Sequence, residues 1–317
     1  MERKIVPKLR HPFLNGLKEL PEGRTKDLKE IRSWMETQPH LPHISDEYIY
    51  LFLHSCFYDQ EKTRQTIENY FTIRANTPSL FADRNVYSDS MEFVTKLACS
   101  FKLPTKTPEG YTVVMYIPRE RENCEYVFSD AIKGFCIYND SIISEDGLVE
   151  GYVVILDIKN MKLGHLVRIT LPALRAFMTY IQEAHPVRLK AIHVTNTNAF
   201  IKQFMRLIAP MIRSELIGLL RFHRGSIPEG MALEMFPKDL GGEAPTTEEL
   251  SLEVVKLKEK YHEWMIETEY FVADESKRAR KGTWWSLFSG SNEIVPNSDD
   301  RQIGGKDQNA LRELEVD

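Results

Sequence analysis

The sequence predicts an α/β fold with a largely parallel sheet, preceded by a small all-α lobe. Apolar residues recur every three or four positions up to about Thr77, which is typical of helices. After Pro104 short β-prone runs alternate with helical stretches, and three of these runs are almost continuously apolar, as buried parallel strands are. Strands that alternate with helices indicate a sheet covered by helices.

Helices are predicted throughout the N-terminal lobe, from Lys26 to Thr77. The first helix has apolar residues at helical spacing, namely Leu28, Ile31, Trp34 and Met35. Pro39 and Pro42 separate it from a second helix, which Ser45 is placed to cap. A third helix begins after Asp59 and has one apolar face, formed by Thr63, Ile67, Tyr70, Phe71 and Ile73.

The region after Pro104 contains four predicted strands and three predicted helices. The strands are Tyr111–Ile117, Tyr152–Asp157, Ala191–Thr195 and Leu219–His223. The helices are Glu125 to about Ser144, Pro172–His185, and Ala199–Ile217 with a break at Pro210. Their alternation with the strands predicts crossover connections between parallel strands.

The C-terminal part changes in composition. Beyond Gly242 it is acidic and helical, from Lys277 it is basic and aromatic, and after Ser289 it is polar. We therefore predict an N-terminal extension (1–25), a helical N-lobe (26–94), an α/β domain (95–245), a C-terminal helix with a packed tail (246–290) and a flexible polar tail (291–317).

Charge and cysteine content exclude several classes of protein. The 317 residues include 41 Lys and Arg against 46 Asp and Glu, a net charge of −5. Since binding to nucleic acid needs a basic excess, we expect no nucleic-acid partner. Four scattered cysteines indicate reduced thiols, and no run of 18 apolar residues or secretion signal is present. We expect a cytoplasmic monomer.

Sequence motifs of common enzymes are absent. No strand is followed by a phosphate-binding glycine loop, and neither Gly-x-Ser-x-Gly nor His-Glu-x-x-His occurs. Asp157, at the end of a predicted strand, is the one carboxylate placed like a catalytic group, with a capping role as the alternative. The sequence leaves open that Asp157, His165 and His193 meet in space. We expect no catalytic residues, no metal and no cofactor.

Several motifs occur in the order that one known family shows. They are Leu51–Asp59, Asn69–Arg74, Gly151–Asp157, Leu163–His165, the pair Ile169 and Thr170, His185–His193 with Asn196, and Phe236–Gly242. Together they resemble the CRAL-TRIO lipid-binding family from about residue 26 to 285. The resemblance is closest to an insect branch similar to the α-tocopherol transfer and retinaldehyde-binding proteins.

This resemblance implies a sheet that floors an apolar cavity below a mobile helical gate, and a carrier of a retinoid, tocopherol or other isoprenoid. Residues matching the cavity wall are Gly134, Tyr138, Tyr152, Leu156, Tyr180, Ile181 and Ile192. The gate would be Ala199–Ile217, with the apolar set Phe200, Ile201, Phe204, Met205, Ile208, Met211 and Ile212. Tyr138 and Tyr180 replace smaller residues of the tocopherol carrier, so we expect them to narrow the cavity.

A basic stretch predicts contact with anionic membranes. Residues 188–224 hold seven Lys and Arg against one acid, Glu215, and would be drawn to an anionic leaflet. Arg188 and Lys190 match headgroup-binding positions of the family, whereas other such positions are not kept. We expect weak, non-stereospecific attraction through Arg188, Lys190, Arg206, Arg213 and Arg221.

The sequence leaves open the role of the C-terminal tail and the choice between several functions. The basic residues of 277–281 precede Trp284 and Trp285, which either pack on the fold or dock on a membrane. The alternative functions are a phospholipid- or phosphoinositide-binding membrane adaptor and a lipid-acting enzyme.

Overall fold

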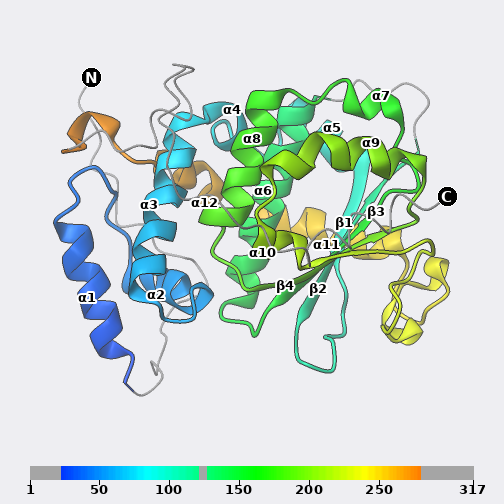
Figure 1. Ribbon diagram of the computed structural model, residues 1–317, viewed down its shortest axis with the longest axis horizontal. Helices are drawn as coiled ribbons and strands as arrows, with labels where there is room; N and C mark the ends of the chain where they lie inside the picture. Colours follow the sequence, from blue (N-terminus) through cyan, green and yellow to red (C-terminus); the bar gives the residue numbers. More distant parts are fainter. Residues whose placement is uncertain (1–22, 121–126, 280–317) are drawn as a thin grey trace, which may run out of the picture.

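The computed structural model describes residues 23–120 and 127–279 (Figure 1). The predicted N-terminal extension lies almost wholly outside these ranges. The tail with Trp284 and Trp285 also lies outside the described residues, so the choice between packing and docking stays a prediction. The predicted domain boundaries stay predictions as well.

The N-terminal region is all-α, as expected. Its helices are α1 (Thr25–Glu36), α2 (Asp46–Ser55), α3 (Gln60–Asn76), α4 (Pro78–Phe81) and α5 (Asp89–Leu97). The Ser45 side chain accepts a hydrogen bond from the Tyr48 amide, so it caps α2 as predicted. Asp59 caps α3 in the same way through the Lys62 amide. All five residues of the expected apolar face of α3 are buried.

A five-stranded sheet follows, with the strands in sequence order from β1 to β5. The strands are β1 (Ala98–Lys102), β2 (Thr112–Pro118), β3 (Tyr152–Asp157), β4 (Leu189–Thr195) and β5 (Leu220–Phe222). Strand β1 pairs with β2 in antiparallel fashion, and the other neighbours are parallel. The predicted fold class is therefore confirmed. Strand β1 escaped prediction because its sequence Ala-Cys-Ser-Phe-Lys has no β-branched residue.

One face of the sheet is covered by helices (Figure 1). These are α6 (Phe128–Asp146), α7 (Leu163–Leu166), α8 (Leu171–Thr179) with a π-helical continuation (Tyr180–Ala184), α9 (Ala199–Ile208), a 3-10 turn (Ala209–Met211) and α10 (Ser214–Ile217). The break before Pro210 is where the sequence places it. Met235 and Phe236 pack in one apolar cluster with Val113 and Ile155, which point to the opposite face of the sheet.

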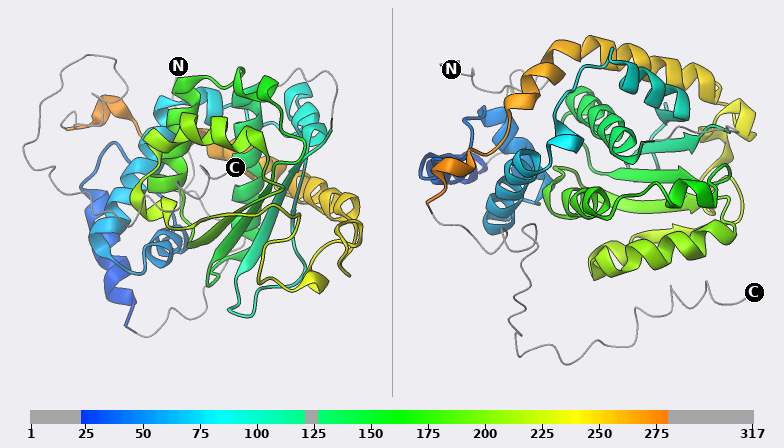
Figure 2. Two further views of the ribbon diagram at one scale, coloured as in Figure 1. Left: turned by 45° about the vertical axis from the view of Figure 1, so that its right-hand side comes forward. Right: turned by 90° about the horizontal axis from the view of Figure 1, so that it is seen from above.

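The chain then returns to the N-lobe. Two short 3-10 turns (Leu233–Met235 and Lys238–Leu240) precede α11 (Thr247–Lys260), α12 (His262–Glu267) and two more such turns (Thr268–Tyr270 and Glu275–Lys277). Helix α11 packs beside β1, on the other side of the molecule from α9 (Figure 2). The Ala273 amide donates to the Phe71 carbonyl over 3.0 Å, which joins the C-terminal segment to α3.

A buried ionic cluster lies where these segments meet. We call Arg74, Arg84 and Asp140 the basic clasp. The Arg84 Nη2 atom lies 2.5 Å from Asp140 Oδ2, and Arg74 Nη1 lies 3.8 Å from the same oxygen. Arg74 also donates to the carbonyls of Thr268 and Phe271. The clasp therefore connects α3, α6 and the C-terminal segment.

Candidate functional site

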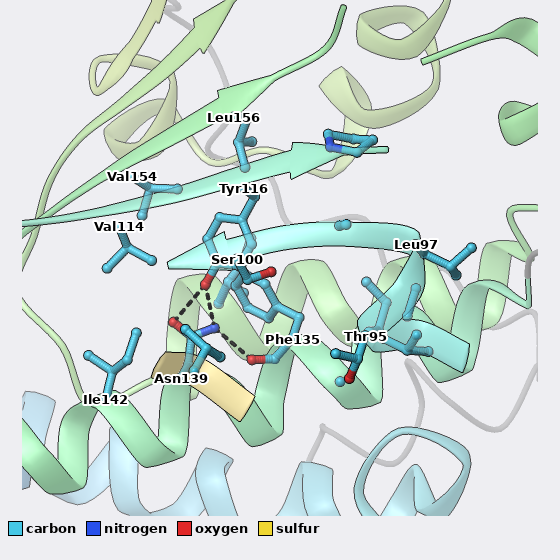
Figure 3. A pocket seen from close by; sticks show the side chains of 18 of the residues that line it. Thr95, Leu97, Ser100, Val114, Tyr116, Phe135, Asn139, Ile142, Val154 and Leu156 are labelled. Carbon is cyan, nitrogen blue, oxygen red and sulfur yellow. Dashed lines mark hydrogen bonds between the residues drawn. The ribbon is translucent and has the colours of Figure 1, made fainter. Parts of the chain in front are cut away.

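An apolar cavity of about 390 Å³ lies between the sheet and helices α5, α6, α8 and α11 (Figure 3). Its floor comes from alternate strand residues: Val114 and Tyr116 of β2, Tyr152, Val154 and Leu156 of β3, and Ile192 of β4. Because successive side chains of a strand point to opposite faces, the residues between them face away from the cavity. Only every second side chain of each strand would therefore contact a ligand in the cavity.

Helices supply the rest of the wall. The α6 residues that line it recur at helical spacing, namely Ala131, Ile132, Gly134, Phe135, Asn139, Ile142 and Ile143. Phe177 and Ile181 contribute from α8 and its continuation. A Cβ atom on Gly134 would lie 2.5 Å from Val94 Cγ1, so the approach of α5 to α6 requires glycine.

Two polar side chains inside the cavity, Asn139 and Tyr116, are hydrogen-bonded to each other. The Asn139 Nδ2 atom lies 2.9 Å from the Tyr116 hydroxyl and 2.8 Å from the Phe135 carbonyl, and both acceptors are drawn in Figure 3. Burial raises the pKa of Tyr116, so the phenol is neutral. This pair adds a polar spot to the wall without a charge.

His185 gives the wall a neutral imidazole. Burial lowers the pKa of His185 to about 4, even though the charge of Asp140 acts in the opposite direction. Its Nε2 atom has no hydrogen-bond partner among the described residues. A ligand hydroxyl or carbonyl near this atom would find an unused polar group.

The structure brings five of the seven predicted cavity residues to the cavity: Gly134, Tyr152, Leu156, Ile181 and Ile192. It corrects the positions of the other two, Tyr138 and Tyr180. Tyr180 turns toward the N-lobe, where its ring centroid lies 4.9 Å from that of Phe81. Tyr138 is buried on α6, with its ring centroid 5.9 Å from that of Tyr116. Neither tyrosine is among the residues that line the cavity, and the expected narrowing stays a prediction.

Sequence reasoning missed the wall contributed by α5 and α11. Thr95 comes from α5, and Ser251, Val254, Val255 and Lys258 come from α11. The signal was present, because these α11 positions follow a spacing of three or four and so share one helix face. Nothing in the sequence said which layer that face contacts.

The predicted gate lies next to the cavity wall and not on it. Phe200, Ile201, Met205 and Ile208 are buried, and Phe204, Met211 and Ile212 pack partly buried against the same core cluster. The rings of Phe200 and Phe204 stack with centroids 5.8 Å apart. None of the seven lines the cavity, which corrects the expectation that they wall it. Gate movement stays a prediction.

The expected anionic-lipid contacts fall into separate places. Arg188 and Lys190 meet at the exposed ring of Phe57, with their cationic groups 4.3 and 5.4 Å from its centroid. Arg206 is exposed on α9, Arg213 pairs with Glu183, and exposed Arg221 donates to the Gly218 carbonyl.

The possible catalytic trio does not assemble. Asp157 accepts hydrogen bonds from the Lys159 amide and the Asn196 side chain, each over 2.8 Å, which is the capping role. His193 pairs with His223 across 2.8 Å, and His165 accepts from the Lys162 amide. Within the described residues, no group of three or more His, Cys, Asp or Glu is arranged to hold a metal ion.

Known proteins match this architecture. Residues 101–242 match the CRAL/TRIO domain, and residues 20–91 match the Pinta-like UBA domain. "Alpha-tocopherol transfer protein-like" of Homo sapiens is 24% identical over 234 residues, which cover 72% of this chain and 68% of the relative. "Clavesin-2" of Rattus norvegicus is 20% identical over 235 residues, which cover 72% of each chain.

A solved structure titled "Crystal structure of Sfh5" aligns with a TM-score of 0.40 and 9% identity, over 74% of this chain and 96% of that one. The insect branch is not shown by these matches and stays a prediction. In the described residues no helix is both long and apolar enough to cross a membrane. The ordered motifs, the sheet and the domain match agree that residues 101–242 correspond to a CRAL/TRIO domain.

Proposed function

We propose that this protein is an intracellular carrier that binds one small hydrophobic ligand, such as a retinoid, tocopherol or another isoprenoid, and transfers it between membranes. The observation that carries the proposal is the largely apolar cavity of about 390 Å³. Ligand pockets for small molecules span roughly 300–1,000 Å³. Burial of apolar ligand surface there contributes about 25 cal/mol per Å².

The alternatives have less support. A cavity near the lower end of that range favours one short chain or ring system over a two-chain phospholipid, which a phosphoinositide adaptor would hold. An adaptor with a vestigial cavity would fill it with side chains, and this cavity is open. A lipid-acting enzyme would need Asp157, His165 and His193 together, and each has separate partners. Relatives named as transfer proteins agree with carriage.

Reversible contact with anionic membranes completes the proposal. Leu163, Val167 and Leu171 are exposed on α7 and the start of α8, Val167 to 85%. Residues 158–182 around them hold four Lys and Arg and no Asp or Glu. Exposed apolar side chains among basic residues suit an anionic interface. Cys56, Cys99 and Cys136 are buried and form no disulfide, in agreement with the cytoplasmic protein that we propose, a monomer without a nucleic-acid partner.

Mass spectrometry of an organic extract of the purified protein tests this function. We expect one unmodified hydrophobic compound at about one molecule per chain. A two-chain phospholipid would favour the adaptor, and time-dependent conversion of added lipid would favour the enzyme. A preparation without any bound lipid that also fails to take up isoprenoids would contradict the proposal.

A further inference from the structure

One end of the cavity carries a cation without an anionic partner. Lys258 lines this end from α11, and its Nζ atom lies 3.5 Å from the Thr95 hydroxyl. That hydroxyl already donates to the Met91 carbonyl over 3.0 Å. An ammonium group has three N–H donors, and no carboxylate of the described residues lies within 4.0 Å of this one.

A second cation of the same cavity wall has an unused donor. Arg119 lines the cavity too, and its Nη2 atom donates to Glu248 over 2.6 Å. The Nε atom of Arg119 is buried and has no partner among the described residues. Buried polar groups are nearly always hydrogen-bonded, so unused donors of two cations in one cavity wall need an explanation.

The ammonium group of Lys258 is poorly solvated. Val254 and Val255 flank Lys258 in the cavity wall, and burial lowers the pKa of Lys258 to about 8. The group is therefore still mostly protonated at pH 7. A desolvated charge without a counter-ion is costly for the protein. An anionic group of the ligand would supply the missing partner.

A neighbouring pocket explains how a charged group could reach this place. It has about 380 Å³, lies between α5 and α11, and shares Thr95, Arg119, Ser251 and Val255 with the cavity. Lys96, Glu120 and Glu248 add polar side chains to it. A polar ligand end would therefore adjoin a polar compartment, while the apolar part of the ligand lies over β2 and β3.

We propose that the cavity selects a single-chain amphiphile that ends in a carboxylate, and that this carboxylate binds Lys258, while Arg119 adds a second positive charge to the same wall. The inference rests on the proposed carrier function and names its ligand class. The apolar body of the ligand extends from there along Tyr116, Val154 and Leu156.

Matched acid and alcohol pairs test the inference by isothermal titration at pH 7. The probes are retinoic acid with retinol and palmitic acid with hexadecanol. We expect each acid to bind at least tenfold more tightly than its alcohol. Lys258→Met should weaken binding of the acids about tenfold and leave the alcohols within twofold, because it removes the charge and keeps the apolar stem. Lys258→Arg should retain the preference.

Lys256→Met is the control, because Lys256 is exposed on the same helix and paired with Glu253, and it should change neither affinity. Equal or tighter binding of the alcohols to the unaltered protein would overturn the inference and leave the carrier function standing. Equal weakening of acid and alcohol by Lys258→Met would overturn it too. Failure of all four probes to bind would overturn the inference, and the carrier function would then be decided by the lipid extract. The comparison of acids with alcohols uses the unaltered protein, so it tests the inference even if a variant does not fold.

Discussion

Two regions of the molecule bury cations, and they do so differently. In the basic clasp, Arg74 and Arg84 share Asp140, and Arg74 also donates to two backbone carbonyls. At the end of the cavity, Lys258 has one long hydrogen bond to a hydroxyl. A buried charge with partners holds segments of the fold together, whereas the buried charge without an anionic partner is the one that we propose binds a ligand.

The two cation sites should also affect different properties: the basic clasp the stability of the fold, and Lys258 the affinity for a ligand. The clasp joins residues almost 200 positions apart, since Arg74 contacts the carbonyls of Thr268 and Phe271. Its role is to connect the N-lobe to the α/β domain and the C-terminal segment. At the cavity the cation makes a single long hydrogen bond between α11 and α5, so a change there should be visible mainly in ligand affinity and hardly in unfolding.

Loss of the clasp carboxylate should have the largest effect on stability. Asp140→Asn keeps the shape of the side chain and leaves two buried guanidinium groups without their counter-ion. We expect the free energy of unfolding to fall by about 3–5 kcal/mol, measured by urea denaturation.

Glu253→Gln is the control, because its pair with Lys256 is exposed and should contribute less than about 1 kcal/mol. If Asp140→Asn changed stability no more than the control does, the clasp would not be a structural connection and the comparison would fail.

The neutral imidazole on the cavity wall predicts a pH dependence. Burial lowers the pKa of His185 to about 4, below the ordinary value of about 6.5 of the unfolded chain. The unfolded state therefore binds the proton more readily, and the contribution of His185 to stability is complete above pH 6.5 and is lost as the pH falls toward 4. The loss should reach about 3 kcal/mol.

His185→Phe removes the titrating group and keeps a flat ring beside the cavity. Between pH 6.5 and 4 its stability should therefore decline less than that of the unaltered protein, in urea titrations at several pH values. Parallel declines in the two proteins would show that His185 is charged or exposed in the folded state, contrary to the description of the wall.

Much of the fold could be predicted from the sequence, and the cavity only in part. The strands Tyr152–Asp157 and Thr112–Pro118 are apolar runs with clear limits, so their burial could be predicted. Tyr138 and Tyr180 have the same chemistry as cavity residues, and only the rotation of their helices directs them elsewhere. The sequence did not identify Lys258 as a cavity residue, because Thr95 of α5, which it contacts in the cavity wall, is more than 160 positions away in the chain.

Arg206 is an exposed cation, and we expect its substitution to have the smallest effect of the three. It is exposed on α9, and this helix lies on the other side of the molecule from α11 (Figure 2). Arg206→Gln should lower binding to vesicles that contain phosphatidylserine by about fivefold, since one basic residue near such a surface contributes about 1 kcal/mol. Vesicle sedimentation measures this. Lys256→Gln, on α11, should have no effect, and equal effects of the two variants would remove α9 from the membrane-facing side.

The central claim is that the cavity over β2 and β3 holds the ligand, and a matched pair of substitutions in β3 tests it most directly. Val154 faces the cavity and Val153 faces away from it, in the opposite layer of the core. We predict that Val154→Trp fills the cavity and abolishes uptake of an isoprenoid probe, with little change in melting temperature. Val153→Trp should overpack the other layer and lower stability by about 1–3 kcal/mol while the folded protein still binds. Uptake that survives in a folded Val154→Trp protein would contradict the account.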